Sequence, residues 1–162
     1  MSSTATQPEL SGAGLHWKAL ESLYASAPVN RLFDSTLRVE APGEARIQFT
    51  VDKNFHHAAG AAHGTIYFKM LDDAAFYAAN TLVTDRFLLT TSFNLHFTAP
   101  IKQGQVIAEG RWISGRRRVF VAESRLITPD GEEIGRGTGT FMRSRIALSS
   151  LSGYSEALKA QA

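Results

Sequence analysis

The chain has 162 residues, no cysteine and a formal net charge of +2, with 44% hydrophobic and 20% charged residues. This composition is typical of one globular domain, and the lack of cysteine excludes disulfides, thiolate catalysis and cysteine-bound metal. The small net charge does not predict nucleic acid as a partner, and no apolar run is long enough to cross a membrane.

Residues 1–13 are predicted to be a disordered tail, and they lack the basic-then-apolar layout of a signal peptide, so we expect a cytoplasmic protein. Apolar residues at helical spacing predict a helix over 15–25, which ends before Pro28. We expect one domain over residues 14–145, followed by a tail or short helix over 146–162.

The middle of the chain reads as strands around one long helix. The runs STLRVEA and EARIQFTV, separated by Pro42-Gly43, predict a hairpin over 36–51, and a loop over 52–62 leads to a long helix over 64–83. Four more strands are expected from residue 87 onward, divided by Pro100 and by the turns GRRR and PDGEE. This order predicts an α+β domain in which about six antiparallel strands wrap around the long helix.

Two adjacent aspartates in that helix lie in different rows of residues four apart. Asp73 follows Lys69 by one turn, so we interpret it as the solvated partner of an ion pair. Asp72 lies between Phe68 and Phe76 in an aromatic row, where partial loss of solvent would make its carboxylate a stronger base. A structural hydrogen bond explains Asp72 equally well, and the residues alone leave both interpretations open.

The start of the helix suggests an anion site. A helix N-terminus exposes unpaired N–H groups, and Gly64 has no side chain to block an approaching oxygen, as an oxyanion hole requires. A turn glycine is the simpler alternative. Nine residues, roughly 13 Å of helix, separate His63 from Asp72, so both can act on one carbonyl only if two subunits build the site.

His63-Gly64 and the aspartate nine residues after His63, together with LTTSFNLHFTAPIKQGQVIAEG and SGRRRVFVAESRLITPDGEEIGRGTGTF, resemble the hotdog-fold acyl-CoA thioesterases. The resemblance is to the phenylacetate-degradation-type (PaaI-like) branch and covers residues 36–143. It implies a homodimer, paired again into a homotetramer, that hydrolyses small to medium acyl or aryl thioesters of coenzyme A without a cofactor or metal.

The resemblance also implies roles for particular residues. The Gly64 amide would bind the thioester oxygen, with His63 beside it, while Asp72 of the partner subunit acts as general base or nucleophile. Thr90 matches a strand hydroxyl that holds the water. The family often has a second glycine where this chain has Thr65, and the threonine side chain would narrow the pocket. It often has Asn or Gln where this chain has His57, and the histidine would still supply a hydrogen-bond donor.

Further residues are candidates for substrate binding. Phe68 and Phe76 are expected to line an acyl pocket, with packing in the core as the alternative. Arg116 and Arg118 alternate to one face of an expected strand, where their guanidinium groups could bind phosphate, a solvated hairpin tip being the alternative. The resemblance implies that this basic position contacts the nucleotide end of coenzyme A. His56, His57 and His63 lie in a loop without i,i+4 spacing, so no metal site is expected.

Two other functions fit the same pattern. A hotdog dehydratase or hydratase would need an acid–histidine pair, and no glutamate occurs between Ala45 and Ala108, which argues against the His–Glu form. A non-catalytic domain that binds or senses acyl-CoA would not need Asp72. The combination of His63-Gly64 with Asp72 favours the hydrolase.

Overall fold

The computed structural model describes residues 12–161, which contain six strands and three α-helices. In chain order these elements are α1 (Gly12–Ser26), β1 (Ser35–Ala41), β2 (Glu44–Val51), α2 (Gly64–Asn80), β3 (Arg86–Phe97), β4 (Gly104–Ser114), β5 (Val119–Ile127), β6 (Glu133–Ala147) and α3 (Ser152–Ala160). Three short 3-10 turns, η1 (Pro28–Leu32), η2 (Lys53–Phe55) and η3 (Leu148–Ser150), connect them.

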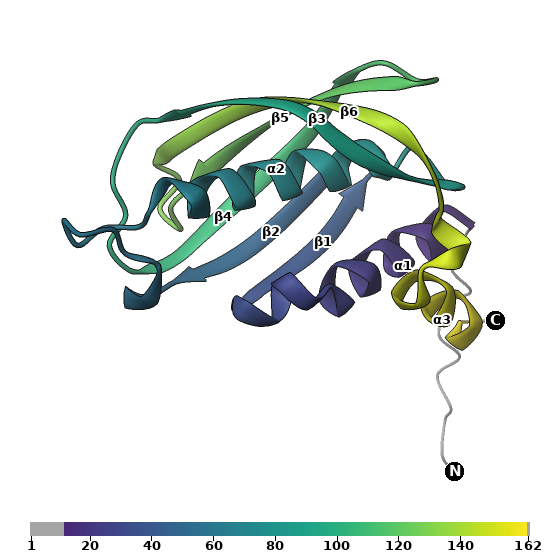
Figure 1. The fold of residues 1–162 in the computed structure, drawn as a ribbon, viewed down its shortest axis with the longest axis horizontal. Coiled ribbons are helices and arrows are strands. Elements are labelled where there is room, and N and C mark those ends of the chain that lie inside the picture. Colours follow the sequence, from purple (N-terminus) through teal and green to yellow (C-terminus); the bar gives the residue numbers. More distant parts are fainter. Residues whose placement is uncertain (1–11, 162) are drawn as a thin grey trace, which may run out of the picture.

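The strands form one antiparallel sheet in the order β1-β2-β4-β5-β6-β3, and the sheet curls around α2 (Figure 1). The predicted α+β architecture of six strands around one long helix is therefore confirmed. The sheet is open, so β1 and β3 are its two edge strands.

Small residues let α2 lie directly on the sheet. Ala74, Ala75, Ala78 and Ala79 are completely buried. Across from them, a Cβ atom on Gly110 of β4 would lie 2.0 Å from the carbonyl oxygen of Ala74, so only glycine allows this approach of helix and strand backbones. The two backbones thus fix the depth of α2 in the sheet.

A β-bulge shapes the strand that faces the polar side of α2. Thr90 of β3 pairs with Phe141 of β6, whereas Ser92, two residues on, pairs with Thr140, so β3 has one extra residue at this point. An extra residue reverses the alternation of side chains beyond it. As a result Thr90 and Phe93, an odd number of residues apart, both contact α2.

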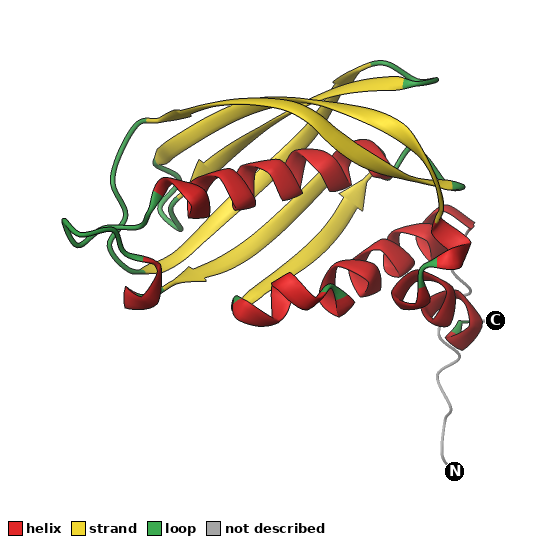
Figure 2. Ribbon diagram, viewed as in Figure 1, coloured by secondary structure: helices red, strands yellow, loops and turns green. Residues whose placement is uncertain are grey.

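The terminal helices pack against each other at one end of the molecule (Figure 2). His16 of α1 links them to α2: its Nε2 lies 3.0 Å from the carbonyl oxygen of Asn80, and its Nδ1 lies 2.6 Å from the hydroxyl of Tyr154 in α3. Because a carbonyl can only accept, Nε2 carries the proton and Nδ1 accepts from Tyr154. Burial lowers the pKa of His16, which favours this neutral form.

Element boundaries differ from the sequence-based ones at three places. Gly12 and Ala13, assigned to the tail, belong to α1, while residues 1–11 lie outside the described part of the chain. The long helix ends at Asn80 rather than at residue 83, because the Asn80 side chain donates to the carbonyls of Val83 and Arg86 and accepts from the amide of Leu88. Strand β6 continues to Ala147, past the expected domain end at residue 145, and α3 follows it.

Candidate active site

Four of the contacts between α2 and β3 involve residues spaced four apart along one row of the helix. From the start of the helix they are Gly64 with Phe97, Phe68 with Phe93, Asp72 with Thr90, and Phe76 with Phe87. We call this row the α2–β3 seam. It places its only charged member, Asp72, between two pairs of aromatic rings.

The Asp72 carboxylate accepts a hydrogen bond of 2.9 Å from the hydroxyl of Thr90. Burial raises the pKa of Asp72 to about 6, the Thr90 hydrogen bond lowers it, the neighbouring charge of Asp73 raises it and that of Lys69 lowers it. A carboxylate with a pKa about two units above normal is still ionised at neutral pH and accepts a proton more readily. The structure therefore brings together the predicted base and the predicted strand hydroxyl.

Asp73 is not the solvated residue that the helix rows predicted. Its ion pair with Lys69 is covered, the two side chains being 23% and 16% exposed, and the Lys69 ammonium also donates to Asn30 Oδ1 at 2.7 Å. The same ammonium lies over the rings of Tyr24 and Phe33. Helix α1 and turn η1 cover this ion pair. The periodicity of α2 alone does not predict where they pack.

The N-terminus of α2 is capped by its own histidine. The Nδ1 atom of His63 accepts from the Thr65 amide at 3.1 Å and lies 3.0 Å from the Thr65 hydroxyl. Within residues 12–161, no group accepts a hydrogen bond from the amide of Gly64. The amide of Gly64 is thus an unused donor at the start of the helix, where the sequence predicted an oxyanion site.

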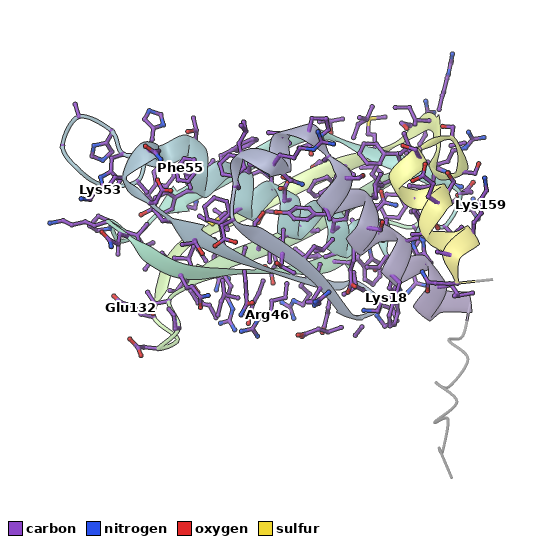
Figure 3. All side chains as sticks on the ribbon, turned by 90° about the horizontal axis from the view of Figure 1, so that it is seen from below. Lys18, Arg46, Lys53, Phe55, Glu132 and Lys159 are labelled. Carbon is purple, nitrogen blue, oxygen red and sulfur yellow. The ribbon has the colours of Figure 1, made fainter. Side chains whose placement is uncertain are left out.

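His57 belongs to the loop that leads into α2. Its Nδ1 accepts from the Ala59 amide at 3.0 Å, and its own amide donates to the carbonyl of Ala61. Lys53 and Phe55, just before this loop, lie at one end of the molecule, whereas Lys159 of α3 lies at the other end (Figure 3). The hydrogen bonds of His57 are therefore made within this loop, and in the described part of the chain none joins its side chain to Asp72.

The two phenylalanines on either side of Asp72 differ in exposure. Phe68 is 41% exposed and therefore remains a candidate for substrate contact. Phe76 is 7% exposed and packs against Tyr77, Phe87 and Phe141, so it belongs to the core rather than to an acyl pocket. Thr65 is exposed beside His63, at the mouth of the site.

Arg116 and Arg118 lie in the turn between β4 and β5, not in a strand, so the argument that they alternate to one face is wrong. Both are exposed, and neither forms an ion pair with any of residues 12–161. The guanidinium of Arg116 lies 5.1 Å from the centre of the Trp112 ring, whose Nε1 donates to Gly115 O. Stacking orients Arg116 and leaves its N–H groups available.

A hollow of about 450 Å³ lies on the outward face of the sheet, away from the α2–β3 seam. Most of its charged lining is already paired, as in the contacts of Glu109 with Arg46 and Arg125 and of Glu123 with Arg111. Paired charges in solvent offer little to a ligand, so the hollow is not a candidate site. Among residues 12–161, no three His, Asp or Glu side chains are grouped as metal ligands, and no helix is long and apolar enough to span a membrane.

The sequence alone did not predict Phe87, Phe93 and Phe97, which are three of the four β3 residues in the seam. The spacing of four between Phe93 and Phe97, in FNLHF, already places these two on one face of a strand. The bulge at Thr91 hid that this face is also the face of Thr90. The three glycines of GRGTGTF on β6 were a further signal, because Phe93 lies against two of them.

Residues 59–134 match the family model described as Thioesterase superfamily. The matched segment contains α2, β3, β4 and β5, and thus the whole α2–β3 seam. No curated protein matches the chain.

Solved structures share the fold. The E. coli PaaI protein from the phenylacetic acid degradation operon is 16% identical with a TM-score of 0.77, over 85% of this chain and 99% of that one. A mutant of phenylacetic acid degradation protein PaaI from Thermus thermophilus is 24% identical with a TM-score of 0.66, over 73% and 100%. Thioesterase HI1161 from Haemophilus influenzae is 16% identical with a TM-score of 0.69, over 77% and 87%.

These matches confirm the resemblance that the sequence showed to hotdog-type thioesterases. The family model covers the segment that carries His63, Gly64, Asp72 and Thr90. The structural likeness, at identities from 16% to 24%, establishes the hotdog fold.

Proposed function

We propose that this chain, whose residues 59–134 match the Thioesterase superfamily, hydrolyses acyl-CoA thioesters to a free acid and coenzyme A. The observation that carries the proposal is the Asp72–Thr90 pair: a carboxylate with a raised pKa, held by a strand hydroxyl between aromatic rings. Such a group is suited to take a proton from water near neutral pH.

In the proposed reaction, Asp72 removes a proton from water while the water oxygen attacks the thioester carbonyl carbon. The carbonyl oxygen gains negative charge, which the free amide of Gly64 at the α2 N-terminus stabilises. The carbon–sulfur bond then breaks, and the proton held by Asp72 passes to the leaving sulfur, so no cofactor is consumed. If Asp72 instead attacks the carbonyl, water hydrolyses the resulting anhydride in a second step.

The seam supports a site shared between two chains. Edge strand β3 has a partner strand on one side only within residues 12–161, and exposed apolar side chains lie along it, with Leu89 47% and Phe97 58% exposed. Such an edge is a template for pairing with a second chain. Antiparallel pairing of β3 with β3 about a twofold axis brings the Thr90 half of one strand beside the Phe97 half of the other.

That pairing places the two catalytic elements together. Phe97 lies on Gly64, since a Cβ atom there would be 3.0 Å from Phe97 Cζ, and Thr90 holds Asp72. In each subunit, the Phe97 half of β3 therefore lies beside the oxyanion donor of that subunit, and the Thr90 half lies beside its base. Two sites, each with the donor of one subunit and the base of the other, follow from the proposed dimer, and a pair of such dimers gives the tetramer.

Phosphate recognition is proposed for Arg116 and Arg118. The β4–β5 turn, which carries both arginines, lies at the end of the sheet where β3 begins. The strand register shows this, because Val119 of β5 and Leu89 of β3 both pair with Met142 of β6. In the dimer this end of one subunit approaches the α2 N-terminus of the other. The two guanidinium groups can then bind the phosphates of coenzyme A.

The direct test measures thiol release from a panel of acyl-CoA thioesters, short and long, aliphatic and aryl. Turnover that depends on Asp72 and not on Asp73 would support the proposal. Binding of coenzyme A thioesters with no release of thiol from any of them would contradict it and would favour the acyl-CoA-binding alternative.

A further inference from the structure

Phe93 fills a space between α2 and β6 that lies one helical turn from Asp72. On one side its ring meets Phe68 edge-to-face, with ring centres 5.6 Å apart. On the other side it lies against the backbone of β6, since a Cβ atom on Gly137 would be 2.4 Å from Phe93 Cε1 and one on Gly139 would be 2.6 Å from Phe93 Cδ2. The ring thus occupies the volume that side chains at 137 and 139 would otherwise take.

The ends of this space are closed by other rings. A Cβ atom on Gly139 would also lie 2.7 Å from Phe141 Cζ, and a Cβ atom on Gly135 would lie 3.2 Å from Tyr67 Cδ1. Tyr67 is itself fixed, because its hydroxyl donates to the carbonyl of Ala99 at 2.7 Å. Phe93 is therefore the one ring of this group that comes from the open edge strand, and it is only half-buried.

Resting on the proposed function, we infer that Phe93 sets the upper limit on acyl length by closing the slot between Phe68 and the β6 glycines. An acyl group whose carbonyl is attacked beside Asp72 extends toward the neighbouring turn of α2, where the Phe93 ring stands. The natural substrates are then thioesters of short acyl groups. Longer chains stay in water or displace the ring, and an apolar pocket discriminates by about tenfold or more for such differences.

The test compares kcat/KM for octanoyl-CoA with that for butyryl-CoA. Replacing Phe93 with alanine should raise the octanoyl-to-butyryl ratio about tenfold or more, and Phe93→Leu should raise it less. Phe87→Ala is the matched control: it removes the same ring from the same strand on the far side of Asp72, next to the fully packed Phe76. An equal rise in Phe87→Ala would mean general loosening of β3 and would overturn the inference.

A second substitution should reverse the effect. In the Phe93→Ala background, Gly137→Ala places a methyl group on the floor of the opened slot, where the next neighbour after the lost ring is Asn94 O at 3.1 Å. The octanoyl preference should then fall back toward the wild-type ratio. If Phe93→Ala does not fold, the smaller shift of Phe93→Leu decides, and its absence overturns the inference.

A binding measurement separates this inference from the proposed function. The thioether S-octyl-CoA cannot be hydrolysed, and calorimetry should show it binding about tenfold or more tightly to Phe93→Ala than to wild type. A gain in affinity without hydrolysis of any thioester would support the role of Phe93 in limiting acyl length and would contradict the proposed hydrolase function. Hydrolysis with an unchanged chain-length ratio would keep the hydrolase and reject the slot.

Discussion

The hydroxyl of Thr90 donates a hydrogen bond of 2.9 Å to Asp72 Oδ1, joining the middle of α2 to the β3 edge strand. The bond stabilises the ionised carboxylate, whereas burial between aromatic pairs destabilises it, and burial dominates because the pKa of Asp72 is raised to about 6. The pair therefore holds a base that is partly desolvated yet charged at neutral pH.

Replacing Asp72 with asparagine should reduce turnover by about 10²–10⁴-fold, the usual contribution of a general base, with little change in thioester affinity. Asp73→Asn is the matched control one residue away and should reduce turnover much less, because its carboxylate is bound to Lys69 under α1 and η1. Steady-state thiol release and binding of a thioether analogue provide the two readouts. A larger loss from Asp73→Asn than from Asp72→Asn would move the assignment to Asp73.

The pH dependence of kcat/KM should report the same carboxyl group. As the proposed base, Asp72 is competent only when ionised, so kcat/KM should rise with pH, reach half its maximum near pH 6 and level off above about pH 7. Thr90→Val keeps the shape of the side chain but removes the hydrogen bond that lowers the pKa, so the midpoint should move to higher pH. An unmoved midpoint, with only the plateau lowered, would restrict Thr90 to a structural role.

Asp72 should also make the fold less stable above its pKa. Because its folded-state pKa is raised, the folded protein binds more protons than the unfolded chain between about pH 4 and pH 6, so stability falls as pH rises through that range. Asp72→Asn removes this cost: the gain in unfolding free energy should be near zero at pH 4 and about 2–3 kcal/mol at pH 7.5. Denaturant unfolding at both values measures it.

The control for this stability measurement is Asp130→Asn, in the exposed turn between β5 and β6. It should show no comparable gain at either pH. A gain at Asp72 that is equal at pH 4 and pH 7.5 would mean that shape or packing, and not ionisation, explains the effect.

Substituting alanine for both Arg116 and Arg118 should raise KM for acyl-CoA more than it lowers kcat, since phosphate contacts far from the reacting carbonyl stabilise substrate and transition state alike. The defect should shrink with a pantetheine thioester, which lacks the nucleotide. Arg46→Ala, on the outward face of the sheet beside Glu109, serves as the control. Equal defects on both substrates would argue against phosphate recognition.

The features that the sequence predicted correctly are those that depend on residues close together in the chain. The hairpin at Pro42-Gly43 and the position of Asp72 among aromatic residues depend on residues close in the chain, and the structure has both. The covered Lys69–Asp73 pair depends on α1 and η1, about forty residues earlier, through the bond of Lys69 to Asn30. The inward position of Phe93 depends on one extra residue in β3, which alternation alone cannot locate.

If Gly64 and Asp72 act on one thioester, as proposed, their spacing on α2 requires a site shared between subunits. The two residues are eight positions apart, about 12 Å along the axis, whereas the base and the oxyanion donor must both reach atoms of one thioester group within about 3 Å. One helix cannot satisfy both contacts, but two helices brought together by β3–β3 pairing can. Twofold symmetry then gives two equivalent sites, each with Gly64 from one subunit and Asp72 from the other.

Mixed dimers test this arrangement. One subunit carries Asp72→Asn and the other Gly64→Val, with different affinity tags so that only mixed dimers are collected. The valine blocks the helix start, and the fold should tolerate it because the nearest side chain, Phe97, is 58% exposed and can move. Each homodimer should be inactive. In the mixed dimer one site has both lesions and the other has none, so about half the wild-type activity should return.

The reciprocal dimer is the control. When one subunit carries both Asp72→Asn and Gly64→Val and its partner is wild type, each shared site has one lesion, so no activity should remain. Sites built within single chains give the opposite pair of results, because the doubly substituted subunit would leave the wild-type site intact and the mixed single lesions would damage both sites. Half activity in the reciprocal dimer, with none in the dimer of single lesions, would therefore reject the shared site and the mechanism that depends on it.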